Sequence, residues 1–392
     1  MANLKIFTEN IDPLAVNQIY EMVSQSTFKD QQVRIMPDAH AGSNCVVGFT
    51  STLGNKIIPN VIGVDIGCGM RTVMLGKIDI DLPALDNFIK NNIPAGSNYA
   101  KEENGRDLIE SLHVAKQLRD FPRLFGSIGS LGGGNHFIEV DEDYDGNKYL
   151  VIHSGSRNLG MQVASIYQKL AVRDCKGVAE EERNAVIKKL KGQGRISEIP
   201  NAIKDVNAKF AYRSKIPNDY CYLDGRHAEK YLHDMRICQV FAERNRARMA
   251  EKILKFLGLS RADYFETVHN YIDENNVVRK GAISAKQGEK VIIPMNMRDG
   301  CLIAIGKGNP DWNFSAPHGA GRLVSRSDAK KLFTEEEFKQ EMKGIYTTTA
   351  DKSTIDESPM AYKPTSEIEA LISPTVEVIA KIFPIYNFKA GD

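Results

Sequence analysis

The sequence lacks an excess of charge of either sign. Its 392 residues include 51 Lys and Arg and 50 Asp and Glu, which gives a formal net charge of +1. Proteins that attract nucleic acid through their overall charge are strongly basic. The composition therefore excludes recognition of RNA or DNA by bulk charge, and a nucleic-acid partner would need a local basic patch.

Long apolar runs and paired cysteines are also missing. No apolar run approaches the roughly 20 residues that a membrane-spanning helix needs. The N-terminal stretch MANLKIFTENIDPLAVNQIY has no apolar signal core, so we expect neither a secretory nor a transit signal. The six cysteines form no CxxC pair, which in a chain of this length is typical of reduced thiols. We therefore expect a cytoplasmic protein with no membrane partner.

The chain has no Pro- or Ser-rich linker, no low-complexity stretch and no evident domain boundary. The hydrophobic fraction of 42% is ample for a large core. Residues 1–30 are expected to form a strand followed by a helix, and residues 193–224 are expected to be irregular. We expect helices within residues 79–126, 158–192, 226–257, 335–344 and 365–382, with strands between many of them.

The stretch NFSAPHGAGRLVSR, residues 313–326, contains the first candidate for catalysis. His318 is followed by Gly319, Ala320 and Gly321, and residues 322–332 are expected to form a helix. A histidine at a glycine turn that opens a helix would lie beside free backbone N–H groups, which favour an anion such as phosphate. A neutral imidazole there can attack phosphorus and act as a covalent catalyst. A histidine that only caps a turn is the more frequent case for such a short motif.

Two further segments place polar residues where the chain is expected to turn. In VRIMPDAHAG, Asp38 and His40 lie in a turn predicted from Pro37 and Gly42, and they form either an Asx-type turn or the edge of a site. In VIGVDIGCGM, residues 61–67 are expected to form a buried strand with Asp65 and Cys68 at its end. This carboxylate and thiol can converge on one metal ion, although a buried structural cysteine is the commoner case.

Histidines follow the same pattern at two later positions. A glycine-rich loop, residues 126–134, leads to Asn135 and His136, after which FIEV is expected to form a strand. His153 ends the strand KYLVIHS, and Arg157 with its Ser and Gly neighbours resembles a phosphate pocket. Ligand-type residues at the ends of several strands commonly build a cleft site. The recurrence therefore favours a site over coincidence.

Taken together, these segments resemble the RtcB family of RNA-splicing ligases. The matching blocks are MPDAHAG, IGVDIGCGM, GSLGGGNHFIEV, VIHSGSR, VHNYID, KGAISAKQGE and APHGAGRLVSR, in the family's order from about residue 36 to residue 389. The resemblance implies one α+β domain spanning residues 1–392, with mixed β-sheets flanked by helices around a central metal and nucleotide cleft.

The resemblance also implies a reaction. The family uses GTP and Mn²⁺ to join an RNA end bearing a 2′,3′-cyclic phosphate or 3′-phosphate to an RNA end bearing a 5′-hydroxyl. His318 matches the histidine that attacks the α-phosphate of GTP and carries GMP, and Asp38 matches an aspartate close to it. GMP then passes to the RNA 3′-phosphate, and the 5′-hydroxyl displaces it. A cyclic phosphate would first be opened by hydrolysis at the same site.

Five residues match the family's metal ligands. Cys68 matches a thiolate that bridges two metal ions. Asp65 and His136 match the other ligands of one ion, and His153 and His269 match those of the second. Two cations a few ångströms apart can polarise a phosphoryl group and activate a hydroxyl. By ligand softness alone, zinc or iron would suit this set as readily as manganese, so manganese follows from the resemblance.

A larger set matches the family's nucleotide-binding positions, with Glu139 expected to accept hydrogen bonds from the guanine edge. The set comprises Asn135, His136, Phe137, Ile138, Glu139, His269, Asn270, Pro294, Met295, Asn296, Met297, Cys301, His318, Gly319, Ala320, Gly321 and Lys389. Arg157, Arg322 and Arg326 are candidates for a local RNA groove. Lys389 follows an apolar run, so we expect the C-terminal segment to be packed.

The sequence departs from the family pattern in places. The stretch PMNMRDG, residues 294–300, stands where the family has PGSMG, and Cys301 replaces a common serine. These changes leave two other interpretations open. One is a dinuclear metal phosphoesterase that never loads a nucleotide, and the other is a non-catalytic protein that binds RNA ends. The sequence identifies neither the RNA nor the oligomeric state.

Overall fold

A seven-stranded antiparallel sheet is the largest of the three sheets in the described part of the chain. The computed structural model describes residues 2–391, apart from the side chains of residues 178–180 and 212–214. The sheet order is β11-β12-β14-β5-β6-β4-β7, and the backbone N–H of Ile292 in edge strand β11 donates to Thr267 Oγ1 in the other edge strand, β7, at 3.2 Å. The sheet is therefore nearly closed on itself. Its strands are β4 (Gly69–Gly76), β5 (Phe137–Glu142), β6 (Lys148–Ser154), β7 (Tyr264–Val268), β11 (Lys290–Asn296), β12 (Gly300–Gly306) and β14 (Val376–Lys389).

Two smaller sheets contain the other strands of the described chain. The five-stranded sheet has the order β1-β2-β3-β9-β8, in which β1 and β2 are parallel and the remaining pairs are antiparallel. A two-stranded sheet pairs β10 with β13. The strands are β1 (Asn3–Ile6), β2 (Gln32–His40), β3 (Val47–Thr52), β8 (Asn270–Ile272), β9 (Val277–Lys280), β10 (Ala282–Ser284) and β13 (Ser315–Pro317).

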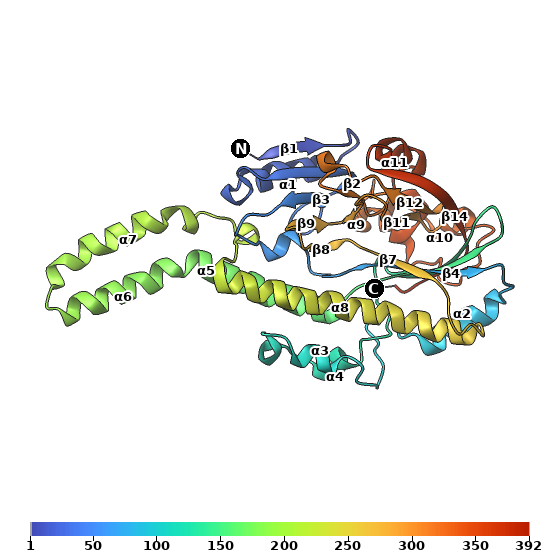
Figure 1. Ribbon diagram of the computed structural model, residues 1–392, viewed down its shortest axis with the longest axis horizontal. Helices are drawn as coiled ribbons and strands as arrows, with labels where there is room; N and C mark the ends of the chain where they lie inside the picture. Colours follow the sequence, from blue (N-terminus) through green and yellow to red (C-terminus); the bar gives the residue numbers. More distant parts are fainter. Residues whose placement is uncertain (1, 392) are drawn as a thin grey trace.

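Helices lie outside the sheets. The longest, α8 (Gly225–Phe256), runs along one side of the molecule, and α6 (Val178–Gly192) and α7 (Ile199–Ser214) project from it as a pair (Figure 1). The remaining α-helices are α1 (Pro13–Ser24), α2 (Leu82–Asn92), α3 (Arg106–Glu110), α4 (Phe121–Phe125), α5 (Arg157–Lys176), α9 (Arg326–Leu332), α10 (Glu335–Glu341) and α11 (Thr365–Ile372). In the described part of the chain, no helix is both long and apolar enough to cross a membrane.

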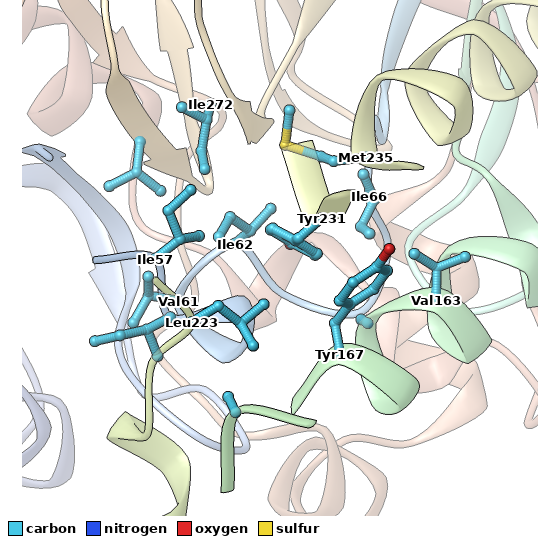
Figure 2. Close-up of a cluster of buried hydrophobic side chains, with 14 of the residues drawn as sticks. Ile57, Val61, Ile62, Ile66, Val163, Tyr167, Leu223, Tyr231, Met235 and Ile272 are labelled. Atoms are coloured by element: carbon cyan, nitrogen blue, oxygen red, sulfur yellow. The ribbon is translucent and has the colours of Figure 1, made fainter. Parts of the chain in front are cut away.

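One apolar cluster fixes the segment that precedes β4 (Figure 2). Tyr231 and Met235 of α8 pack with Tyr167 of α5, and the two tyrosine rings meet edge to face with centroids 5.1 Å apart. Ile62 and Ile66 belong to the same cluster and are fully buried. The amphipathic spacing in α8 thus anchors the residues on either side of position 65.

The α+β fold class predicted from the sequence is confirmed, as are several of its elements. The first 30 residues contain β1 and α1, and Asp12 Oδ1 caps α1 by accepting from the N–H of Ala15 at 2.8 Å. Helices α5, α6, α8 and α10 lie where helices were expected, and Lys389 ends β14 with its side chain buried. The organisation of residues 1–392 as one domain stays a prediction.

Other local predictions were wrong. Residues 61–67 do not form a strand, because Gly63 and Gly67 adopt positive φ angles of 96° and 72° that break an extended chain. Asp38 and His40 lie in β2 and not in a turn. Residues 79–126 contain long loops around α2, α3 and α4, while residues 193–224, expected to be irregular, contain α7.

The two helices expected near the C-terminal end are shorter than predicted. Residues 322–325 precede the helix, which begins at Arg326 after the Ser325 side chain accepts from the N–H of Asp328 at 3.2 Å. Helix α11 ends at Ile372, two residues before Pro374, and residues 376–382 belong to β14. Pro374 lacks the backbone N–H that would continue the helical hydrogen bonds, so α11 ends before it. The apolar residues after Pro374 pair with β12 and β5 instead.

Candidate active site

His318 is held by Asp38. Asp38 Oδ2 accepts hydrogen bonds from His318 Nδ1 at 2.6 Å, from the His318 backbone N–H at 3.0 Å and from the Gly319 N–H at 3.2 Å. Asp38 is completely buried, whereas the His318 side chain keeps 16% of its exposure. A carboxylate that accepts from Nδ1–H leaves Nε2 with its lone pair. The pair therefore holds the imidazole in the tautomer that can attack an electrophile.

These hydrogen bonds change the expected role of the glycine turn. The N–H groups of His318 and Gly319 donate to Asp38 and are not free for a phosphate, and the turn does not open a helix. Glycine is needed because the backbones come close. At Gly321, where φ is 75°, a Cβ atom would lie 2.3 Å from the carbonyl oxygen of Asp38. The absence of a side chain thus lets the turn approach β2.

The five predicted ligand residues meet at the same end of four neighbouring strands of the large sheet. His136 precedes β5, His153 lies in β6, Cys68 precedes β4 and His269 follows β7, and these four strands are neighbours. Cys68 Sγ lies 3.4 Å from His136 Nε2 and 3.3 Å from His153 Nε2. His153 Nε2 lies 3.4 Å from His269 Nε2, and His136 Nε2 lies 3.0 Å from Asp65 Oδ2. Cys68 therefore belongs to two groups of three, one with Asp65 and His136 and the other with His153 and His269.

The chemistry of these donors fits metal binding. The second ring nitrogens of two histidines contact backbone carbonyls, His136 Nδ1 with Leu131 at 2.9 Å and His153 Nδ1 with Asn135 at 3.0 Å. Such bonds fix the neutral tautomer and leave Nε2 as the metal-binding atom. The Nε2 atoms of both residues point into the cluster, next to Cys68 Sγ. The residues present thus suit two cations that share the sulfur atom.

Burial and charge set the protonation of the cluster. Burial lowers the pKa values of His153 and His269 well below the ordinary value, so both rings are neutral. Burial would raise the pKa of Asp65, but the close contact of its carboxylate with the His136 ring and nearby charges bring it down to about 2. Burial and the charge of Asp65 raise the pKa of Cys68. A bound cation reverses this last effect, because a coordinating thiol is deprotonated.

A large cavity joins His318 to the predicted nucleotide-binding residues. The rings of His269 and His318 have centroids 4.9 Å apart, so His318 lies directly beside the cluster. The cavity has a volume of about 1230 Å³, enough for a nucleotide. Among the predicted nucleotide-binding residues, its wall contains Asn135, Phe137, Glu139, Pro294, Met295, Asn296, Met297, His318, Gly319, Ala320, Gly321 and Lys389.

Some predicted contact residues lie outside this wall. Ile138 points to the opposite face of β5 and is buried in the apolar core with Val140. Asn270 contacts the backbone next to the cluster, where its Nδ2 donates to the Asp65 carbonyl at 3.1 Å. Cys301 lies behind Glu139, with Sγ 3.9 Å from Oε1. His136 and His269 are members of the cluster and do not line the cavity, and neither does Arg157.

The sequence alone did not reveal Glu357, which contacts three cations of the cavity wall. It accepts from Lys389 Nζ at 2.8 Å and from Arg322 Nη1 at 3.1 Å, and Arg326 Nη1 lies 2.7 Å from it. Glu357 is 1% exposed, and these cations hold its pKa well below the usual range although burial opposes them. No local pattern in residues 351–363 marked it, because its partners are distant in the sequence.

In His318, Nε2 keeps a free lone pair beside two groups of potential metal ligands at a large cavity. Such an arrangement is typical of enzymes that transfer phosphoryl or nucleotidyl groups. The family model described as "tRNA-splicing ligase RtcB" matches residues 18–124 and 113–390. The chain therefore belongs to the RtcB family, and the family resemblance inferred from its motifs is confirmed.

Individual relatives match nearly the whole chain. The RNA-splicing ligase RtcB of Escherichia coli (strain K12) is 28% identical, over 96% of this chain and 95% of the relative. RNA-splicing ligase RtcB1 of another Escherichia coli strain has the same identity and coverage. The tRNA-splicing ligase RtcB of Nanoarchaeum equitans is 28% identical over 91% of this chain and 87% of its own length.

Proposed function

We propose that the protein is an RNA ligase that uses GTP and manganese to join an RNA 2′,3′-cyclic phosphate or 3′-phosphate end to a 5′-hydroxyl end. Membership of the RtcB family and relatives named as RNA-splicing ligases support an enzyme that acts on RNA. The end chemistry, the nucleotide and the metal come from the family resemblance. A cytoplasmic location is part of the same proposal.

The observation that carries the mechanism is the pairing of His318 with Asp38. With Nδ1–H donated to Asp38, His318 Nε2 can attack the α-phosphorus of GTP, forming an N–P bond while the bond to the β-phosphate oxygen breaks and pyrophosphate leaves. An oxygen of the RNA 3′-phosphate next attacks the same phosphorus and releases His318, giving an RNA-ppG end. The 5′-hydroxyl oxygen then attacks the RNA phosphorus, loses its proton, and displaces GMP. A cyclic phosphate is first opened by water.

The side chains around Cys68 would hold the two ions. Asp65 and His136 would complete the ligands of one ion, and His153 and His269 those of the second, with Cys68 shared. When bound, the ions supply charge stabilisation for a phosphoryl group and lower the pKa of a hydroxyl nucleophile. The position of His318 next to His269 brings the attacking nitrogen close to these ligands.

The cavity wall offers a nucleotide both apolar and charged contacts. Phe137 and Glu139 face the cavity from β5, and Lys389 Nζ lies 5.3 Å from the centroid of the Phe137 ring. We assign the guanine base to the part of the cavity that contains Glu139. Arg322 and Arg326 also line the cavity, so they are the candidates for RNA phosphates, whereas Arg157 is bonded to Gly96 and Ser130.

The PMNMRDG stretch fits within this arrangement. Met295 is buried and packs with Ala320 beneath the glycine turn. The side chain of Asn296 is bonded to its own loop, accepting from the N–H groups of Arg298 and Asp299. The stretch thus forms part of the cavity wall, and none of its residues belongs to the two groups of side chains that contain Cys68.

Ligation of a broken RNA tests the proposal. One RNA strand with a 2′,3′-cyclic phosphate and a labelled strand with a 5′-hydroxyl should be joined in the presence of GTP and Mn²⁺. Omitting either GTP or Mn²⁺, or replacing His318 with Ala, should abolish the product. Opening of the cyclic phosphate without joining, at a rate independent of GTP and of His318, would contradict the ligase and support the metal phosphoesterase. Binding of RNA ends without any reaction would support the non-catalytic binder.

A further inference from the structure

Glu139, which lines the cavity, belongs to a group of three buried side chains with Asp141 and Cys301. One oxygen from each of Glu139 and Asp141 and the sulfur of Cys301 lie within 4.8 Å of one another. Glu139 is 2% exposed, Asp141 is fully buried and Cys301 is 1% exposed. Glu139 and Asp141 are two residues apart in β5, so their side chains point to the same face of the sheet. Two carboxyl groups therefore share one dry site.

The surroundings of the two carboxyl groups differ. Glu139 Oε2 accepts a hydrogen bond from the side-chain amide of Asn387, and the positive charge of Lys389 favours the ionised form of Glu139. Apart from the Cys301 thiol, a weak donor, no donor among the described residues reaches either oxygen of Asp141 at hydrogen-bonding distance. A buried anion without a donor or a cation is strongly disfavoured. Two neighbouring buried carboxylates also cannot both be ionised. The arrangement therefore places a proton on Asp141 and leaves the charge on Glu139.

The other titratable groups around the pair do not change this assignment. Cys301 on β12 is a neutral thiol, because burial and the carboxylates raise its pKa. Lys389 on β14 is bound to Glu357. Tyr149, opposite Asp141 on β6, donates to Asp143. Burial and the charge of Glu139 raise the pKa of Asp141 well above its usual range, while burial raises that of Glu139 to about 7.

We infer that Asp141 is held as a neutral carboxylic acid that keeps Glu139 ionised, and that it is thereby a positioning residue that sets the preference of the site for guanine. This inference rests on the proposed function, in which Glu139 receives the base. The terminal torsion of a carboxyl group is soft, so the Asp141 hydroxyl can turn toward Glu139 and donate to it.

The chemistry of the purine edge gives the preference. Guanine presents two donors, N1–H and the exocyclic amine, and an ionised carboxylate accepts from both. A protonated Glu139 would offer one donor and one acceptor, which match N1 and the amine of adenine. Loss of the proton on Asp141, or loss of its hydrogen bond, would therefore weaken discrimination between the two purines.

Binding measurements on variants of Asp141 test the inference. Affinities for GTP and ATP would be measured by calorimetry without Mn²⁺, from pH 6 to pH 9, for the wild type, Asp141→Asn and Asp141→Leu. Asp145→Leu makes the same change at an exposed position of the same hairpin and is the matched control. Thermal melting of each variant shows whether it is folded.

Asn can donate to Glu139 as the neutral acid does, so Asp141→Asn should follow the wild-type pH profile and keep its preference for GTP. Leu cannot donate, so the pKa of Glu139 should rise. GTP affinity should then fall at pH 7 by up to about tenfold for each unit of that rise, and recover toward pH 9. An equal loss at every pH would overturn the inference. A pH profile of GTP binding whose midpoint is lower in Asp141→Asn than in the wild type would also overturn the inference, because that shift would show that Asp141 is ionised in the wild type.

Infrared difference spectroscopy separates this inference from the proposed function. The wild type should show a protonated carboxyl band at pH 7.5 that is absent in Asp141→Asn, whether or not GTP binds. If the band is present and GTP does not bind, the nucleotide assignment fails and the neutral Asp141 stands. If the band is absent, or if metal analysis finds an ion that is lost in Asp141→Asn, the neutral acid is wrong.

Discussion

Asp38 Oδ2 and His318 Nδ1 lie 2.6 Å apart, although 280 positions separate the two residues in the chain. The same oxygen accepts from two backbone N–H groups of the glycine turn. One carboxylate therefore sets both the tautomer of the imidazole and the position of its backbone.

Replacing Asp38 with Asn should slow the loading of GMP onto His318. The amide cannot accept all three hydrogen bonds, and it permits the tautomer in which Nε2 carries the proton. We expect a loss of about 10³-fold or more, as is typical when the group that orients a catalytic histidine is replaced. The measurement is the single-turnover rate of label transfer from α-labelled GTP. Asp311→Asn, on the surface beside Lys5, is the control, and an unchanged rate in Asp38→Asn would contradict this role.

Replacing Cys68 with Ala should remove both metal ions, because the sulfur belongs to both groups of ligands. Elemental analysis after dialysis against Mn²⁺ should find two ions in the wild type and less than one in Cys68→Ala. Cys238→Ala removes another fully buried thiol, in α8 and outside both groups, and should keep two ions. Retention of one full ion in Cys68→Ala would show that the sulfur is not shared.

The ion-free protein should lose stability as the pH falls below 6.5, partly because of His40. Burial lowers the pKa of His40 to about 4, and its Nδ1 lies 2.9 Å from the Asp38 carbonyl. The unfolded state binds the proton first, so this contribution is complete above pH 6.5 and declines as the pH falls toward 4. Between pH 7 and pH 5, His40→Gln should lose about 2 kcal/mol less of its free energy of unfolding than the wild type.

Urea denaturation at the two pH values measures this difference. His233→Gln, at a half-exposed position on α8 outside the cavity wall, is the matched histidine control. Equal pH-dependent losses in His40→Gln and the wild type would show that His40 is protonated in the folded state.

Glu357 should be important for stability as well as for the cavity wall. Glu357→Gln leaves Lys389, Arg322 and Arg326 without their shared anion, and removing one partner of a buried charged network costs about 3–5 kcal/mol. Glu341→Gln breaks an exposed pair with Arg298 and should cost less than about 1 kcal/mol. Urea denaturation compares the two, and similar losses would contradict the special position of Glu357.

The sequence predicted which side chains meet better than it predicted the local structure around them. His136, His153 and Cys68 were expected at strand ends, and they meet because β5, β6 and β4 are neighbours in one sheet. The family resemblance also implied that Asp38 lies close to His318. Their contact, however, depends on the approach of the glycine turn to β2, which no local pattern encodes.

Tertiary packing explains the local predictions that were wrong. Asp38 has a turn-favouring composition around it, yet three hydrogen bonds from the turn at His318 and Gly319 hold it in a strand. Helix α7 packs mainly on α6, and only Val206 and Phe210 are buried among its residues whose burial is described, so its sequence offers few core positions. Glu357 takes its role from Lys389, Arg322 and Arg326, which are distant in the chain, and Asp141 takes its role from its complete burial, so the sequence alone could not identify either.

The most direct test of the central claim is the attachment of GMP to His318. The wild type, His318→Ala and His40→Ala would be incubated with Mn²⁺ and GTP labelled at the α-phosphate, denatured and digested for peptide mapping. We predict an acid-labile, base-stable label on the peptide that contains His318 in the wild type and in His40→Ala, and no label in His318→Ala. Absence of label from wild-type protein that holds both ions, or label on another residue, would contradict the account.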